Sequence, residues 1–259
     1  MKGGGRAVKV VSLLYPLITV GLVFAVWAVA AYAVDLPIVL PTIGETFRGL
    51  GELLASADFY AAAGGTLLRT LIGFAISLIL ALAMALPAAF FKPVEKLLTP
   101  LVLISRAVPT MSVILLCLLW VSNRILPVVV SVFIVFPVLY TTILNAVQGV
   151  DEKLKQMSRI YNVPRARTAV KLYIPQSMPS ILSGVQSTLG LMVKLIIAAE
   201  VMSNTARSIG QSMSLAQMYL ETDVLIAYTL VAIVLSAALE GIVALIKKYA
   251  LRWNCADNI

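Results

Sequence analysis

Ionisable side chains lie inside strongly apolar segments of this 259-residue sequence, and they are its main candidates for chemistry. Lys194 follows an uncharged stretch, residues 172–193, and Glu240 interrupts another apolar run. A charge placed in lipid costs free energy, so such residues usually face water or pair with one another. A lysine facing a water-filled path would suit an anionic solute, whereas one that snorkels outward, or pairs with Glu200 or Glu240 to hold the helices together, would have only a structural role. The sequence leaves both roles open.

We predict that three charged residues could line a translocation path: Lys194, Glu200 and Arg106. Glu200 lies six residues after Lys194, on a different helix face and near the end of its apolar segment, which favours a structural role. Arg69 and Arg106 lie near the ends of apolar segments, where long side chains commonly snorkel to the membrane surface.

The residue types needed for catalysis are missing. The sequence has no histidine, which removes the commonest metal ligand and general base. No lysine is followed by serine or threonine, so there is no Walker A phosphate-binding loop. Cys117 and Cys255 are far apart and indicate neither a metal site nor a disulfide framework. We therefore expect no catalytic, cofactor-binding or metal site, and the chain would not be an enzyme.

The composition is that of a membrane protein. Hydrophobic residues make up 61% of the chain, charged residues 12%, and the mean hydropathy is +0.99, whereas a soluble domain carries roughly a quarter charged residues. A spanning helix needs about 20 apolar residues. We predict an all-α membrane protein with six transmembrane helices in one domain, residues 1–259. The six segments are 10–34, 70–91, 107–123, 125–150, 172–193 (continuing to 199) and 224–246.

The basic residues indicate the orientation of these six segments. With six spans both termini lie on one side, and 14 of the 20 lysines and arginines fall in segments on that side, against three in the opposite loops. Lysine and arginine are in excess in cytoplasmic loops, so we predict cytoplasmic N- and C-termini. The basic residues flank apolar runs without interleaved stacking aromatics, which argues against nucleic-acid binding.

The largest predicted cytoplasmic feature is the segment 149–176. We expect it to form two short helices joined by a turn. Apolar residues share one face of the first helix at helical spacing, so that helix is amphipathic. Such a helix could lie on the lipid headgroups or bind another protein, and the pattern alone leaves both open. The residues on this face are Leu154, Met157, Ile160 and Tyr161.

Polar and proline residues predict where the helices of this segment begin and end. Asn162 can end the first helix in a left-handed conformation. Pro164 suits the first turn of the second helix. Pro175 and Pro179 are then expected to break the chain before it enters the membrane again.

The same segment resembles the EAA loop of ABC importer permeases. That loop has the pattern Glu-Ala-Ala, three residues, Gly, about nine residues, then an apolar residue, Leu and Pro. Here Gln156, Met157 and Ser158 stand at the first three positions and Asn162 at the glycine, while Ile174-Pro175 matches the end. The resemblance implies that the segment docks into a groove of an ABC ATPase. The docking residues would be Leu154, Gln156, Met157, Ser158, Ile160, Tyr161, Asn162, Pro164 and Pro175.

Further motifs extend the resemblance over nearly the whole chain, and they are most similar to the nitrate, sulfonate and taurine branch of these permeases. The implied fold is that of a type I ABC importer permease. The motifs are Leu-Pro-Thr at 40–42, Thr-Leu-Leu-Arg-Thr-Leu-Ile-Gly-Phe at 66–74, Thr-Pro at 99–100 with Ser-Arg-Ala-Val-Pro at 105–109, Ala-Glu at 199–200 and Leu-Arg-Trp-Asn at 251–254.

This resemblance implies a multi-pass protein of the bacterial inner membrane, in contact with lipid and assembled with other chains. Two copies of an ABC ATPase subunit would bind ATP and Mg, a second permease copy would complete a homodimer, and an extracytoplasmic solute-binding protein would deliver the solute. We expect a small anion such as a sulfonate or nitrate, or alternatively a thiamine precursor or another heterocyclic vitamin-like solute. A carrier that needs no ATPase would instead require paired broken helices in two matching halves, and the sequence lacks that symmetry.

Overall fold

A computed structural model describes the backbone of residues 4–251, and the side chains of residue 15, residues 18–164 and residues 167–251. Residues 252–254 of the last motif, and Cys255, lie outside this part. Every element in the described chain is helical, which confirms the predicted all-α class. The elements are α1 Gly4–Val34, α2 Ile43–Ala55, α3 Ala57–Phe90, α4 Lys92–Ala107, α5 Thr110–Trp120, α6 Leu126–Gln148, α7 Glu152–Ile160, α8 Arg165–Thr168, the π-helical turn η1 Ala169–Tyr173, α9 Ile174–Ser203, α10 Ile209–Met218 and α11 Thr222–Ala250.

Four helical stretches within the described residues are long and apolar enough to cross a membrane alone, namely α3, α6, η1 with α9, and α11. Helices α4 and α5 meet the same criterion only as a pair, and they are bent by 94° relative to each other. The part of α1 from Ile18 to Val34 is a shorter apolar helix. The apolar character of the segments is therefore confirmed, while six complete spans remain a prediction.

The expected extent of the third span, residues 107–123, is wrong. Residues 92–106, which lay outside the expected span, form α4 together with Ala107, and the apolar stretch continues only after a break at Val108 and Pro109. Proline lacks an amide hydrogen and disfavours helical geometry in the preceding residue. The chain therefore ends one helix at Ala107 and changes direction before beginning the next at Thr110.

The core of the bundle lies where α6 packs between α3 and α9. Fully buried residues come from each of these helices, including Ala85, Ile143 and Ile196. Gly73 of α3 permits this close approach, since a Cβ there would overlap Met192 of α9. Small residues commonly allow membrane helices to pack in this way.

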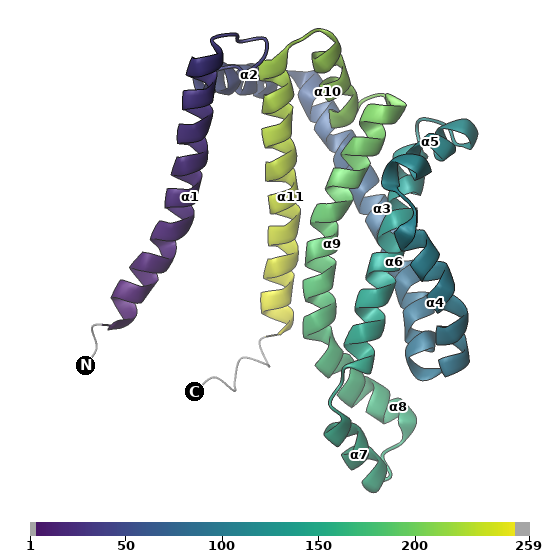
Figure 1. The fold of residues 1–259 in the computed structure, drawn as a ribbon. Helices are drawn as coiled ribbons and strands as arrows, with labels where there is room; N and C mark the ends of the chain where they lie inside the picture. The colour runs from purple at the N-terminus through teal and green to yellow at the C-terminus, as the bar shows by residue number, and fades with distance from the viewer. Residues whose placement is uncertain (1–3, 252–259) are drawn as a thin grey trace.

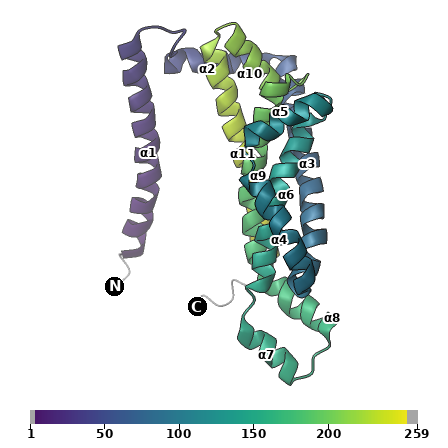
Figure 2. The same ribbon diagram turned by 45° about the vertical axis from the view of Figure 1, so that its right-hand side comes forward.

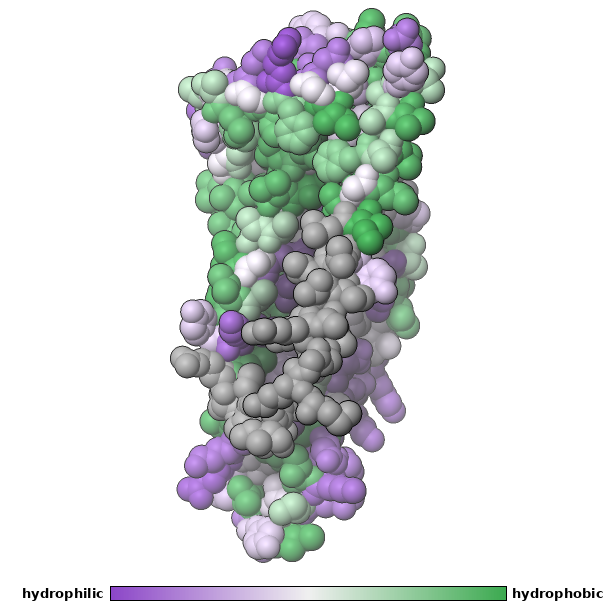
Figure 3. Space-filling view, turned by 90° about the vertical axis from the view of Figure 1, so that its left-hand side faces the viewer, coloured by the Kyte–Doolittle hydropathy of each residue, from purple (hydrophilic) through white to green (hydrophobic). Residues whose placement is uncertain are grey.

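The two ends of the bundle are formed by different elements (Figures 1 and 2). The start of α1, the end of α11 and the α7–α8 segment lie at one end, and α2, α5 and α10 lie at the other. Figure 3 shows hydrophilic residues at both ends of one face and mostly hydrophobic residues in the upper part between them. Apolar side chains exposed over the middle of a bundle are typical of a lipid-facing surface.

Helix α1 stands beside the bundle instead of within it (Figure 1). Its exposed side chains include Val20, Leu22 and Val26. Trp27 donates a hydrogen bond from Nε1 to the carbonyl of Pro41, 3.1 Å away, which ties the helix to its own following loop. A helix that is apolar on its exposed sides suits a membrane environment.

Candidate functional site

The α7–α8 segment forms a short helical hairpin at one end of the bundle (Figure 2). The Asp151 carboxylate accepts a hydrogen bond from the amide of Lys153 at 2.9 Å and caps the start of α7. Asn162 has a φ of +47°, which confirms the predicted left-handed end of the helix. The carbonyl of Pro164 then accepts from the amide of Thr168 at 3.0 Å, so Pro164 opens the next helical turn.

Apolar side chains at the tip of this hairpin are uncovered. Met157, Ile160 and Tyr161 are 52%, 75% and 74% exposed, whereas Leu154 and Ser158 are half-buried. Leu154, Met157 and Tyr161 share the lining of a hollow of about 390 Å³ with residues of α8 and η1. Gln156 and Asn162 are exposed. Exposed apolar side chains in a cluster often mark a binding surface for another protein.

The expected chain break at Pro175 and Pro179 is wrong, because the helix runs without interruption from α8 through η1 into α9. In the π-helical turn the amide of Ile174 bonds to the carbonyl of Ala169, five residues back. This wider turn directly precedes Pro175, and it accommodates a residue that has no amide hydrogen to donate to the helix. Ser183 Oγ donates to the carbonyl of Pro179 at 2.8 Å, so that carbonyl is also bonded.

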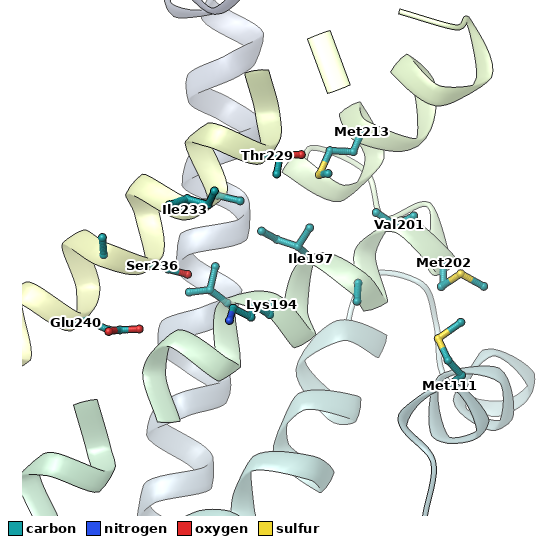
Figure 4. A pocket seen from close by; sticks show the side chains of 14 residues that line it. Met111, Lys194, Ile197, Val201, Met202, Met213, Thr229, Ile233, Ser236 and Glu240 are labelled. Atoms are coloured by element: carbon teal, nitrogen blue, oxygen red, sulfur yellow. The ribbon is translucent and has the colours of Figure 1, made fainter. Parts of the chain in front are cut away.

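A second hollow, of about 750 Å³, opens between α9 and α11, and we call it the α9–α11 groove (Figure 4). Most of its lining is apolar, with one methionine contributed by α5 and another by α10. Two hydroxyl residues and two charged residues interrupt this apolar surface. The lining residues are Met111, Val193, Lys194, Ile197, Ala198, Val201, Met202, Met213, Thr229, Ala232, Ile233, Ser236, Ala237 and Glu240.

Lys194 and Glu240 line this groove from opposite helices (Figure 4). Among the described residues, neither side chain has a hydrogen bond or an ion pair. The pairing of Lys194 with Glu200 or Glu240 that the sequence left open is therefore not formed in this structure. Sequence analysis treated Glu240 only as a pairing partner, although its position inside an apolar run was a signal that it faces the same groove.

Glu200 lies outside the groove and is completely buried. Its carboxylate forms an ion pair with Arg69 of α3 at 2.8 Å and accepts hydrogen bonds from Thr66 Oγ1 at 2.8 Å and from the amide of Gly210 at 3.3 Å. The expected snorkelling of Arg69 is wrong, because its guanidinium lies against this carboxylate and the carbonyl of Ala206. These contacts support the structural role favoured for Glu200.

Arg106 is exposed in the last turn of α4, beside the bend that leads to α5. It does not line the α9–α11 groove. The structure thus brings Lys194 together with Glu240, and it separates both from Glu200 and Arg106. A part for Glu200 or Arg106 in a translocation path stays a prediction.

Residues 77–250 match the family described as the binding-protein-dependent transport system inner membrane component. The chain belongs to this family. The membership predicted from its sequence motifs is thus confirmed. As a member of this family the chain is an ABC transporter permease, a membrane subunit of an importer.

Relatives of this permease carry names that refer to sulfonates and to a pyrimidine. The chain is 28% identical over 243 residues to the aliphatic sulfonates transport permease protein SsuC of Escherichia coli (strain K12), covering 93% of this chain and 91% of that protein. It is 26% identical to SsuC of Bacillus subtilis (strain 168), covering 92% and 87%. It is 22% identical to the formylaminopyrimidine transport permease protein ThiX of Halalkalibacterium halodurans, covering 66% and 69%.

A solved structure supports the fold of this permease. A chain from the crystal structure of an amino acid ABC transporter with histidines superposes with a TM-score of 0.67 at 16% identity, covering 77% of this chain and 97% of that chain. The part of this chain outside that coverage is about a quarter of its length. At such low identity the likeness concerns the fold alone, and it agrees with the predicted permease architecture.

Proposed function

We propose that this permease carries a small solute into the cell through a path that includes the α9–α11 groove. An extracytoplasmic binding protein delivers the solute, and a separate ATPase drives transport by hydrolysing ATP with Mg. The observation that carries this proposal is the exposed apolar tip of α7, with Met157, Ile160 and Tyr161 uncovered at one end of the helical bundle (Figure 1). Such a surface fits a docked ATPase better than it fits water.

The proposed topology has six membrane crossings, with α4 and α5 together forming the third. Both termini lie in the cytoplasm, on the same side as the α7–α8 hairpin, and the excess of basic residues on that side supports this orientation. Two copies of the permease form a homodimer around the path, and one ATPase subunit docks on each hairpin. Closure of the ATPase pair on ATP then switches the permease between outward-open and inward-open states.

The proposed solute is a small anion such as a sulfonate. Two observations support this choice, namely the unpaired Lys194 in the groove and the sulfonate permeases among the relatives. Lysine attracts an oxyanion more strongly inside an apolar groove than in water, because the local dielectric constant is lower. A thiamine precursor is the alternative, supported by the similarity to ThiX.

The test is purification of the tagged permease from its own cells, followed by transport in proteoliposomes. We expect an ABC ATPase to co-purify in equal copy number and labelled alkanesulfonate to enter only when ATP and the binding protein are present. Uptake of a labelled pyrimidine instead of the sulfonate would favour the alternative solute. Solute uptake without any ATPase would contradict the proposed function.

A further inference from the structure

Helix α7 has few contacts that fix its orientation. It projects beyond the ends of α6 and α9 (Figures 1 and 2). The structure describes all nine of its residues, and none of them is fully buried. Two short connections, residues 149–151 and 161–164, join it to α6 and α8. Burial of apolar surface normally holds a helix on its neighbours, so the orientation of α7 depends on a small number of side-chain contacts.

Lys155 makes one of these contacts, with the end of α6. Its side chain is only 15% exposed. The ammonium group donates a hydrogen bond to the carbonyl oxygen of Gln148 at 3.0 Å. Gln148 is the last residue of α6, and the final carbonyl groups of a helix have no partner within it. The helix dipole also favours a cation at this end. A charged donor makes a stronger hydrogen bond than a neutral one, so Lys155 ties α7 firmly to α6.

The same ammonium group lies over the ring of Tyr173, 6.0 Å from its centroid. An aromatic face attracts a cation within about this distance. Tyr173 is the last residue of η1, directly before α9, and its ring packs edge-on against Phe90 at the end of α3, with the centroids 5.1 Å apart. Glu152, on α7 itself, lies 3.4 Å from the lysine nitrogen. Lys155 therefore lies at the junction of α7 with α6 and η1, and its aromatic partner extends this junction to α3.

From these contacts we infer that Lys155 is a positioning residue, which holds the hairpin at a fixed angle to the bundle. With the cation in place, α7, the end of α6 and the start of α9 move as one body when a docked ATPase moves the hairpin. Without it, α7 turns about its two short connections and absorbs part of that movement. This role requires no contact between Lys155 and the ATPase. The inference rests on the proposed function and adds a residue through which its driving force is transmitted.

The first test is Lys155→Met, which keeps the length of the side chain and removes its charge. In proteoliposomes the probe is labelled alkanesulfonate or labelled pyrimidine, whichever the native complex takes up. We expect the ATPase to co-purify with the variant, and the number of probe molecules carried per ATP hydrolysed to fall by about tenfold, as for the loss of one charge-assisted hydrogen bond. A merely destabilised complex would lower uptake and hydrolysis together, and an unchanged ratio would overturn the inference.

Two further variants test the chemistry of the contact. Lys155→Arg keeps a cation that reaches the same carbonyl and ring, so it should retain most of the native ratio. Tyr173→Leu removes the aromatic face and should lower the ratio. The matched control is Lys153→Met, because Lys153 is exposed on the same helix and has no ion pair among the described residues. A ratio as low in Lys155→Arg as in Lys155→Met would show that the charge is not responsible.

A distance measurement reports the orientation of α7 directly. Spin labels replace Arg159 on α7 and Ser187 on α9, both exposed, in a chain whose native cysteines are changed to serine. Double electron–electron resonance on the native complex should give a narrow distribution of distances that ATP leaves nearly unchanged, because the hairpin and α9 move together. Lys155→Met should broaden this distribution, and Lys153→Met should not. A distribution that stays narrow in Lys155→Met would contradict the positioning role.

Two outcomes separate this inference from the proposed function. If the ATPase co-purifies and drives uptake but Lys155→Met keeps the native ratio and the narrow distribution, only the positioning role is wrong. If no ATPase co-purifies, the proposed function is wrong, while the label distances in the full-length permease still report whether Lys155 fixes α7. Size-exclusion profiles of the variants show whether each is folded before the comparison.

Discussion

Arg69 of α3 and Glu200 of α9 form an ion pair, with Nη1 and Oε1 2.8 Å apart, in which the carboxylate is fully buried and the guanidinium mostly buried. They are 131 residues apart in the sequence. Thr66 connects this pair to α10, because its hydroxyl donates a hydrogen bond to Glu200 and accepts one from the amide of Ile209 at 2.9 Å. The pair thereby joins α3, α9 and the start of α10.

We expect Glu200→Gln or Arg69→Met to destabilise the permease by about 3–5 kcal/mol, because removal of one partner leaves the other charge buried and uncompensated. The measurement is thermal unfolding in detergent, with the yield of folded protein recorded alongside. The double variant Arg69→Met, Glu200→Met serves as control and should recover part of the loss. Additive losses in the double variant would show that the two side chains do not act as a pair.

The tip of α7 gives a second prediction. Met157→Asp should leave membrane insertion intact and abolish substrate-stimulated ATP hydrolysis, because an unpaired charge buried at the ATPase interface costs several kcal/mol. The control is Lys153→Asp, at an exposed position in the first turn of the same helix. Normal stimulated hydrolysis in Met157→Asp would remove the hairpin from the coupling role.

The third prediction concerns copy number. A path formed between two identical permeases requires two copies related by a two-fold axis along the membrane normal, the usual symmetry of a homodimer. Native mass spectrometry of the purified complex should therefore find two permeases and two ATPases. A single permease copy, or a different partner permease, would be inconsistent with this assembly.

The fourth prediction concerns Lys194. Lys194→Met should lower transport or weaken the selection of anionic over cationic solutes, because the groove loses its cation. Uptake is measured in proteoliposomes and divided by the amount of assembled complex. If uptake only follows the amount of complex, Lys194 has a structural role in the bundle.

The capping box of α2 provides a pH-dependent prediction outside the membrane-spanning segments. Hydrogen bonds from the amide and the hydroxyl of Thr42, at 2.8 and 2.9 Å, lower the pKa of Glu45 below its ordinary 4.5. A lowered pKa in the folded state means that the cap contributes its full stability above pH 4.5 and loses it as the pH falls through the lowered value. The protection of amide hydrogens at the start of α2, which is the intrinsic exchange rate at each pH divided by the observed rate, should therefore fall over that range in the native chain. In Glu45→Ala this protection should already be low above pH 4.5.

Local features of the fold could be predicted from the sequence. Asn162 ends α7 in the predicted conformation, because a short polar side chain tolerates positive φ wherever it occurs. The apolar segments predicted the helices, since lipid requires long runs of such residues. The bend at Pro109 was missed, because proline marks an interruption but does not reveal whether the two helices share one crossing.

Contacts between distant segments could not be predicted. Arg69 and Glu200 meet only because α3 and α9 pack side by side. Arg69 alone suggested snorkelling, and Glu200 alone suggested a structural role without revealing its partner. Glu240 and Lys194 line one groove for the same reason. Packing determines which helix lies opposite Glu240, and the hydrophobic periodicity of α11 does not reveal it. The candidate groove therefore required the three-dimensional structure, whereas the two short helices of the α7–α8 hairpin did not.

The unbroken helix from α8 through α9 has a mechanical consequence. Twenty residues separate Ile174 from Lys194, a length of about 30 Å along a rigid rod. If an ATPase docks on the hairpin as proposed, a tilt that it imposes there would displace the helix sideways by an amount that grows with distance from the hairpin, so Lys194 would move farther than the residues near η1. Nucleotide-driven movement at this end of the bundle would thereby change the width of the α9–α11 groove, with no signal relayed from side chain to side chain.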